Sequence, residues 1–199
     1  MSVAYTFGRM PERLPSLSIA IGSGIAETLQ GLGVRDIGLK WPNDIYLQDA
    51  KICGILSEVA PKNPQGCTVV TGIGLNVDFG NADMQEAGAP GQFIDLASCS
   101  TEIPSRSALA AILMSTLFET MQRFSAAGLA HFLPTWNRYD WLRGKNVKVD
   151  TAAGLVCGVA DGVDPDGALL LNCHNTVRHL MSGSVTLDNG ARACAPVES

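Results

Sequence analysis

The run of residues 40–44, with the sequence KWPND, places a lysine directly before a rigid Trp-Pro pair. Lys40 ends a short apolar stretch at 37–40, so we expect it at the end of a strand. A cation held there can stand between two anions that must meet, such as a carboxylate and a phosphate, and stabilise the charge that develops. A lone lysine is more often a solvated surface group, so this prediction for Lys40 depends on the motifs around it.

Two glycines at alternate positions of a β-rich run, Gly72 and Gly74, form the second motif. Alternate residues of a strand share one face, and glycine there removes side chains where a ligand must lie against the backbone. Asn76 follows at the same spacing and carries an amide that can contact nucleotide groups. A G-x-G pair alone is a weak signal, but the lysine motif before it and the asparagine after it strengthen the prediction of a binding site.

The order and spacing of these motifs resemble those of biotin protein ligases. In that family KWPND is followed by a short spacer, by K-x-x-G-I-L-x-E, which here begins at Lys51, and by G-x-G-x-N, which here is 72–76. The C-terminal part, with Gly158 and the runs 164–171 and 183–185, looks like the SH3-like barrel that ends the family's proteins. The resemblance therefore extends over nearly the whole chain.

The resemblance implies an enzyme, a biotin–[acetyl-CoA-carboxylase] ligase. Such an enzyme uses ATP, accompanied by Mg2+, to form biotinyl-5'-adenylate, and passes biotin to a lysine of the biotin carboxyl carrier domain of a carboxylase. The family pattern implies that Lys40 is the catalytic cation, and that Gly72, Gly74 and Asn76 border the adenylate. Lipoate ligases share this fold in broad terms, but the G-I-L and G-x-G-x-N motifs favour biotin.

Four further residues have two interpretations each. Asn43 and Asp44 would make a turn in any protein, and the resemblance implies that this turn also shapes the floor of the active site. Lys51 is either a charge that protects an edge strand from aggregation or a cation beside the adenylate. Phe93, in the stretch 88–96 that corresponds to the family's adenylate-binding loop, either covers the adenine ring or anchors the loop on the core.

One part of the family pattern is absent from the sequence. Biotin protein ligases carry a glycine- and arginine-rich segment before the position equivalent to Ser2, whereas no G-R-G-R-x-G-R pattern occurs here. We therefore expect a ligase truncated at the N-terminus of its catalytic domain, with a degenerate paralogue as the second explanation. The alternative function is a non-catalytic module that binds nucleotide weakly, or that pairs through a sheet edge with a carrier domain or with a second copy as a homodimer.

Hydrophobic periodicity predicts an α+β protein. Strands are expected at 2–7, 37–40, 45–47, 51–59 and 67–77, and helices at 16–32, 105–128 and 129–139. The resemblance implies a mixed β-sheet with covering helices, similar to class II aminoacyl-tRNA synthetases, over residues 1–143. Short strands at 146–150, 155–161, 168–171 and 184–187 predict a small β unit over 144–199, which by resemblance is the SH3-like barrel.

Composition limits the other functions. The formal net charge is -5, so a surface for the phosphate backbone of nucleic acids is not expected. The six cysteines form no C-x-x-C pair and the histidines lack metal-ligand spacing, so no metal site is predicted. No apolar run is long enough to span a bilayer and the N-terminal residues do not resemble a secretory leader, so we expect a cytoplasmic protein without a membrane partner.

Overall fold

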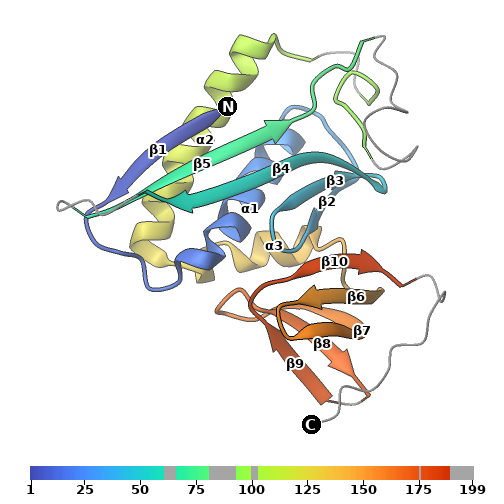
Figure 1. Cartoon of the computed structure of the whole chain (residues 1–199). Helices are drawn as coiled ribbons and strands as arrows, with labels where there is room; N and C mark the ends of the chain where they lie inside the picture. The colour runs from blue at the N-terminus through green and yellow to red at the C-terminus, as the bar shows by residue number, and fades with distance from the viewer. Residues whose placement is uncertain (61–65, 81–92, 100–102, 175, 189–199) are drawn as a thin grey trace.

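The computed structural model describes residues 1–60, 66–80, 93–99, 103–174 and 176–188, which form two five-stranded sheets with helices against the first (Figure 1). The first sheet contains β1 (Ser2–Phe7), β2 (Ile37–Lys40), β3 (Asp44–Leu47), β4 (Ala50–Val59) and β5 (Cys67–Leu75), in the spatial order β1-β5-β4-β3-β2. Its strands pair only in the antiparallel sense within the described residues, so the expected mixed sheet is wrong. The α+β class is confirmed.

One face of the first sheet is covered by helices, and Figure 1 shows the opposite face without them. The covering elements are η1 (Leu14–Ser16), α1 (Leu17–Gly31), α2 (Arg106–Ala127), η2 (Leu129–His131) and α3 (Leu133–Tyr139). The hydroxyl of Ser105 accepts a hydrogen bond from the Ala108 N–H at 3.3 Å and so caps α2 at the expected residue. The single helix expected at 129–139 is instead η2 followed by α3, because Pro134 in the first turn of α3 has no N–H to continue a helix.

The second sheet contains β6 (Asn146–Thr151), β7 (Gly154–Val163), β8 (Leu169–Cys173), β9 (Thr176–Leu180) and β10 (Ser184–Leu187), in the order β10-β6-β7-β8-β9. Four of these strands were expected, whereas β9 was not, because its polar and exposed residues show no apolar face. Within the described residues the end strands β9 and β10 do not pair with each other, so the sheet is open. The closed SH3-like barrel is therefore not confirmed.

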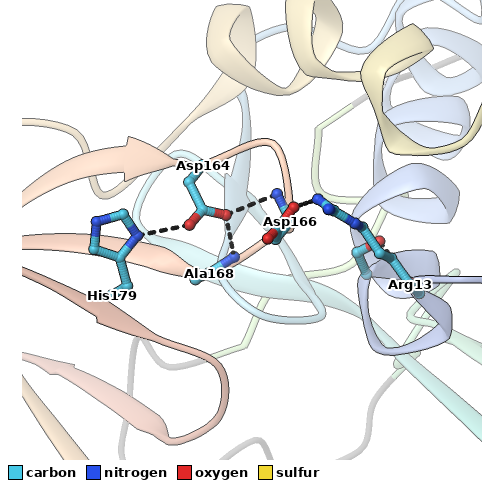
Figure 2. A network of polar contacts seen from close by, with 6 residues as sticks. Arg13, Asp164, Asp166, Ala168 and His179 are labelled. Atoms are coloured by element: carbon cyan, nitrogen blue, oxygen red, sulfur yellow. Dashed lines mark hydrogen bonds and ion pairs between the residues drawn. The ribbon is translucent and has the colours of Figure 1, made fainter.

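A turn between β7 and β8 joins the second sheet to the start of α1. Figure 2 shows that the Asp164 carboxylate organises this turn. It accepts hydrogen bonds from the N–H groups of Asp166 and Ala168 at 2.8 and 2.9 Å, and its other oxygen lies 2.7 Å from Nδ1 of His179. Asp166 in turn forms an ion pair with Arg13, just before η1. The turn thus has a fixed shape and a fixed place against the first part of the chain.

The same turn is packed tightly against the segment that carries Lys40. The indole Nε1 of Trp41, a fully buried side chain, donates a hydrogen bond to the Gly167 carbonyl at 3.0 Å. Gly167 has a φ of +88°, and a Cβ there would lie 2.6 Å from Cβ of Ser16 and 3.1 Å from Cδ1 of Ile19. Only glycine meets both conditions, the left-handed backbone and the close approach.

Within the described ranges no helix combines the length and the apolar character that a membrane crossing requires.

Candidate functional site

A row of four opposed residues crosses the first sheet at the KWPND turn. Lys40 pairs with Asp44, Asp44 with Gly54, and Gly54 with Gly74. Directly opposed residues of antiparallel strands project to the same face. Leu39, which precedes Lys40 on β2, is fully buried under the helices, so the row belongs to the opposite, helix-free face.

An open hollow of about 420 Å³ lies on this face. Gly72 and Gly74 form part of its floor, as the sequence predicted for a ligand that lies against the backbone. A Cβ on Gly72 would find its nearest neighbour, Oγ of Ser2, at 3.6 Å, and a Cβ on Gly74 would find the Gly54 carbonyl at 3.9 Å. Side chains there would not clash, so the glycines keep space free above the strand. The lining residues are Met1, Ser2, Asn43, Asp44, Lys51, Gly54, Ile55, Leu56, Gly72, Ile73 and Gly74.

Lys51 and Asp44 form an ion pair inside the hollow. The Lys51 Nζ lies 2.6 Å from Oδ1 of Asp44, and a Cβ on Gly54 would come within 3.2 Å of the same Nζ. The Lys51 side chain therefore extends across the face of Gly54. The edge-strand interpretation of Lys51 is wrong, because β4 lies between β3 and β5 in the middle of the sheet.

Lys40 lies beside the hollow, outside its lining. Its Nζ donates a hydrogen bond to the hydroxyl of Tyr46 at 3.1 Å and lies 5.0 Å from the centroid of the Tyr46 ring. In the row, Asp44 and Gly54 stand between Lys40 and Gly74. Two lysines of the site thus differ in their partners: Lys51 is paired with a carboxylate, and Lys40 is bound to a neutral hydroxyl.

Asn43 holds the KWPND turn against β4. Its side-chain amide donates to the Ile55 carbonyl at 2.8 Å, and the Ile55 N–H donates to the Asn43 carbonyl at 2.9 Å. Pro42, joined to Trp41 by a cis peptide bond, accepts a further hydrogen bond at its carbonyl from the hydroxyl of Ser18 at 3.1 Å. The turn that carries Lys40 is therefore tied both to the sheet and to α1.

Asn76 and Phe93 lie at the end of the sheet rather than in the hollow. The Asn76 amide donates to the carbonyls of Lys51 and Ile94, at 3.3 and 3.1 Å, so its N–H groups already have backbone partners. Phe93 is half-buried and forms a parallel bridge with Lys51. Of the predicted adenylate loop, the structure describes residues 93–96, while residues 88–92 lie outside the described residues. The roles of Asn76 and Phe93 toward a nucleotide stay predictions.

Asp95 fixes the piece of chain that follows Phe93, and the sequence analysis did not single it out. This buried carboxylate accepts hydrogen bonds from the Phe79 N–H at 2.7 Å and from the N–H and hydroxyl of Ser98. Burial alone would raise the pKa of Asp95, but the hydrogen bonds outweigh it and hold the pKa below its ordinary value of 3.8. Asp side chains commonly accept hydrogen bonds from the backbone N–H groups of nearby residues in a turn, and this tendency is the signal that could have identified Asp95.

We expect Asp95→Asn to lower the free energy of unfolding by about 1–3 kcal/mol at neutral pH, because the amide accepts fewer hydrogen bonds. A depressed folded-state pKa stabilises the protein above the unfolded value of 3.8, and this contribution is lost as the pH falls through the folded value. The difference in the urea midpoint of unfolding between the unaltered chain and Asp95→Asn should therefore become smaller in acid. Asp161→Asn, at a 64% exposed carboxylate, should show little effect at any pH. A gap that is independent of pH would contradict this role.

Cys53, which precedes Gly54 on β4, is the thiol nearest the row. It is buried, and burial together with the negative charge of Asp44 raises the pKa of the Cys53 thiol to about 12. A thiol with this pKa stays protonated at neutral pH, and the thiolate is the reactive form. Cys53 is therefore a packing residue and no nucleophile.

Tyr46 is the other site residue that the sequence analysis missed. It lies two positions after Asp44 on β3, so the two-residue period of a strand places both on one face. That period could have identified Tyr46 as a neighbour of Lys40, which pairs with Asp44 across the strands. The contact itself also requires the register of the β2–β3 hairpin, which no sequence motif specifies.

Two sequence profiles match the chain, one on each side of the junction between the sheets. The profile described as "Biotin/lipoate A/B protein ligase family" matches residues 9–76, and "Biotin protein ligase C terminal domain" matches residues 143–188. The chain belongs to the biotin protein ligase family. The first match contains the whole row and the hollow's glycine floor, and the second contains the turn that packs on Trp41.

Named members of the biotin protein ligase family are similar to the chain over most of its length. The bifunctional ligase/repressor BirA of Escherichia coli K12 is 32% identical over 187 residues, which cover 94% of this chain and 57% of that protein. The biotin–[acetyl-CoA-carboxylase] ligase of Mycobacterium tuberculosis is 27% identical over 173 residues, covering 85% of this chain and 61% of that protein. The chain thus spans less than two thirds of the length of these relatives.

Solved structures show the same fold. The apo biotin protein ligase of Aquifex aeolicus aligns with a TM-score of 0.80 at 20% identity, over 94% of this chain and 82% of that chain. A biotin protein ligase-like protein of unknown function from Silicibacter sp. TM1040 aligns with a TM-score of 0.69 at 16% identity, over 90% and 76% of the two chains. These likenesses establish the biotin ligase fold for the chain.

Proposed function

We propose that this chain binds biotinyl-5'-adenylate on the helix-free face of the first sheet, as part of an ATP-dependent biotin protein ligase. The observation that carries the proposal is the row from Lys40 to Gly74 together with Lys51, which is paired with Asp44 of the row, so that two lysines and an open glycine floor share one face of the sheet. The hollow's volume of about 420 Å³ lies in the usual range for small-ligand sites.

The proposed reaction has two steps. A carboxylate oxygen of biotin attacks the α-phosphorus of ATP and pyrophosphate leaves; the amine of an acceptor lysine then attacks the adenylate carbonyl and AMP leaves. Both reactants of the first step are anions, so fixed positive charge at their meeting point lowers the barrier. Lys40 supplies that charge, and Lys51 supplies a second cation whose charge Asp44 balances while no ligand is bound.

Mg2+ enters the proposal only with ATP, as the ion held by its phosphates. Among the described residues there is no group of three or more His, Cys, Asp or Glu side chains arranged to hold a metal ion. The Asp44 carboxylate, the acidic group in the row, is already engaged by Lys51. ATP and biotin are the substrates in the proposed reaction.

The acceptor in this proposal is a lysine of the biotin carboxyl carrier domain of a carboxylase, met in the cytoplasm. A homodimer through the exposed edge strand β1 is a further part of the proposal. The non-catalytic alternative is less favoured, because the lysines, the turn and the glycine floor are all retained in one connected arrangement. Activity of the whole reaction stays a proposal, since the chain covers 57% of its E. coli relative.

Replacing Lys40 by alanine tests the proposal directly. We expect Lys40→Ala to weaken binding of biotinyl-5'-adenylate by about 10- to 100-fold in isothermal titration calorimetry, because a charge-assisted contact to the ligand is lost. Lys148→Ala is a control for the loss of a lysine away from the site, since Lys148 lies in the second sheet, where its Nζ is 2.8 Å from Oδ1 of Asp188. An unchanged dissociation constant in Lys40→Ala would remove Lys40 from the site, and no binding by the unaltered chain would reject the proposal.

A further inference from the structure

The Lys40 amine is held by a residue outside the KWPND motif. Tyr46, on the neighbouring strand, accepts a hydrogen bond from Nζ of Lys40 at 3.1 Å and presents its ring 5.0 Å from the same atom. A lysine side chain is a flexible four-carbon stem, so a single acceptor that fixes its end restricts where the charge is found. The contact therefore decides the direction in which Lys40 presents its ammonium group.

The partner of Lys40 differs in kind from the partner of Lys51. Lys51 is paired with the Asp44 carboxylate at 2.6 Å, which neutralises its charge. The Tyr46 hydroxyl is neutral, so it orients Lys40 without cancelling the positive charge. Of the two lysines Lys40 and Lys51, Lys40 is thus the one that is held by a neutral group, which leaves its charge for an anionic ligand.

Tyr46 is itself fixed by an aromatic side chain from the junction between the sheets. The rings of Tyr46 and Trp141 stack with centroids 4.6 Å apart and planes inclined by 31°. The backbone N–H of Trp141 donates a hydrogen bond to the Leu39 carbonyl on β2 at 2.9 Å. Gly38 makes room for this approach, because a Cβ there would lie 2.8 Å from the Trp141 ring.

The indole of Trp141 is also held from its far side. Its Nε1 donates to Oδ1 of Asp49 at 3.1 Å, and Nζ of Lys145 lies 3.4 Å from the ring centroid. The hydrogen bonds of its backbone and its ring, together with the cation over the ring, hold the indole in place. Trp141 thus acts as a fixed support against which the Tyr46 ring rests.

We propose that Tyr46 is a positioning residue for Lys40, and that Trp141 sets the position of the Tyr46 ring. The inference rests on the proposed function, because it takes Lys40 as the cation that meets the adenylate. Tyr46 touches Lys40 rather than the ligand, so its effect on binding should depend entirely on the presence of the Lys40 amine.

A double-mutant cycle tests this dependence. Tyr46→Phe keeps the stacked ring and removes only the hydroxyl, so we expect binding of biotinyl-5'-adenylate to weaken by about three- to tenfold. In a Lys40→Ala background the same change should have no further effect. Tyr139→Phe is the matched control, because it removes a hydroxyl bonded to Gln30 on the helical side and should leave binding unchanged.

A measurement without ligand separates the two proposals. Brief acylation with a lysine-reactive ester, followed by peptide mass spectrometry, should label Lys40 several-fold faster in Tyr46→Phe than in the unaltered chain, with Lys148 as internal standard. If Lys40→Ala weakens binding but Tyr46→Phe changes neither binding nor labelling, the inference is overturned and the proposed function stands. If labelling of Lys40 rises but no protein binds the adenylate, the orienting contact stands and the proposed function is rejected. Equal losses from Tyr46→Phe with and without Lys40 would also overturn the inference.

Discussion

Replacing Gly74 by valine should abolish binding of biotinyl-5'-adenylate while leaving the fold intact. Gly74 lies on the floor of the hollow, and a Cβ there meets its nearest atom, the Gly54 carbonyl, at 3.9 Å, which is ordinary contact distance. Val70, four residues earlier on the same face of β5, shows that this strand tolerates valine. Since valine also favours strands, the added methyl groups should occupy ligand space at no cost to folding.

The expected loss of affinity is about 100-fold or more, with an unchanged or slightly higher melting temperature, measured by calorimetric titration and thermal unfolding. The Gly74→Ala protein should have an affinity between those of the unaltered chain and the Gly74→Val protein. Ala4→Val, on the same face of β1 but outside the hollow, is the control for added bulk and should bind normally. Normal binding by a folded Gly74→Val protein would show that the ligand does not lie on the glycine floor.

Replacing Gly167 by alanine should lower the free energy of unfolding by about 2–4 kcal/mol. Two costs add: the left-handed backbone at φ +88°, and a Cβ only 2.6 Å from that of Ser16. Relief of the clash would move the turn away from α1 and stretch the bond from the Trp41 indole to the Gly167 carbonyl, which is 3.0 Å in the structure. Urea unfolding followed by near-ultraviolet circular dichroism of the buried tryptophans measures the loss.

Gly33 offers a matched control for the backbone cost alone. It has the same φ of +88°, and no atom lies within 4 Å of a Cβ built on it. Gly33→Ala should therefore cost about 1 kcal/mol, which is the conformational cost without the clash. Equal losses in the two variants would show that the packing of the turn on α1 contributes nothing.

Much of the fold could be predicted from local pattern. Alternation and helical spacing located most strands and both long helices, and Ser105 marked the start of α2 correctly. Two errors have physical causes. β9 is an edge strand without an apolar face, and the expected mixed sheet came from the resemblance, whereas the short connections from β2 to β3 and from β3 to β4 require antiparallel pairs. Sequence periodicity reports which residues are buried, but not which strand lies beside which.

The site could be predicted only in part for the same reason. Five residues that the motifs singled out line one hollow, namely Gly72, Gly74, Asn43, Asp44 and Lys51, and their contact with an adenylate stays a prediction. The motifs did not predict that Lys40 lies beside the hollow and bonds to Tyr46. That contact depends on the register of β2 with β3, and the position of the Tyr46 ring depends on Trp141 from the junction between the sheets. The sequence left open whether Lys51 lies on an edge strand, and the strand order shows that it lies on an inner strand of the sheet.

The indole of Trp41 has a consequence for exchanging the C-terminal part of the chain. Its N–H is buried and finds its acceptor on the other sheet, at Gly167. Exchanging the C-terminal part for an unrelated module would leave this donor in an apolar interior without an acceptor, at a cost of about 1–3 kcal/mol, directly next to Lys40. The two parts are therefore matched at this bond, and a chimera keeps it only if its C-terminal part presents a backbone carbonyl at the position of Gly167.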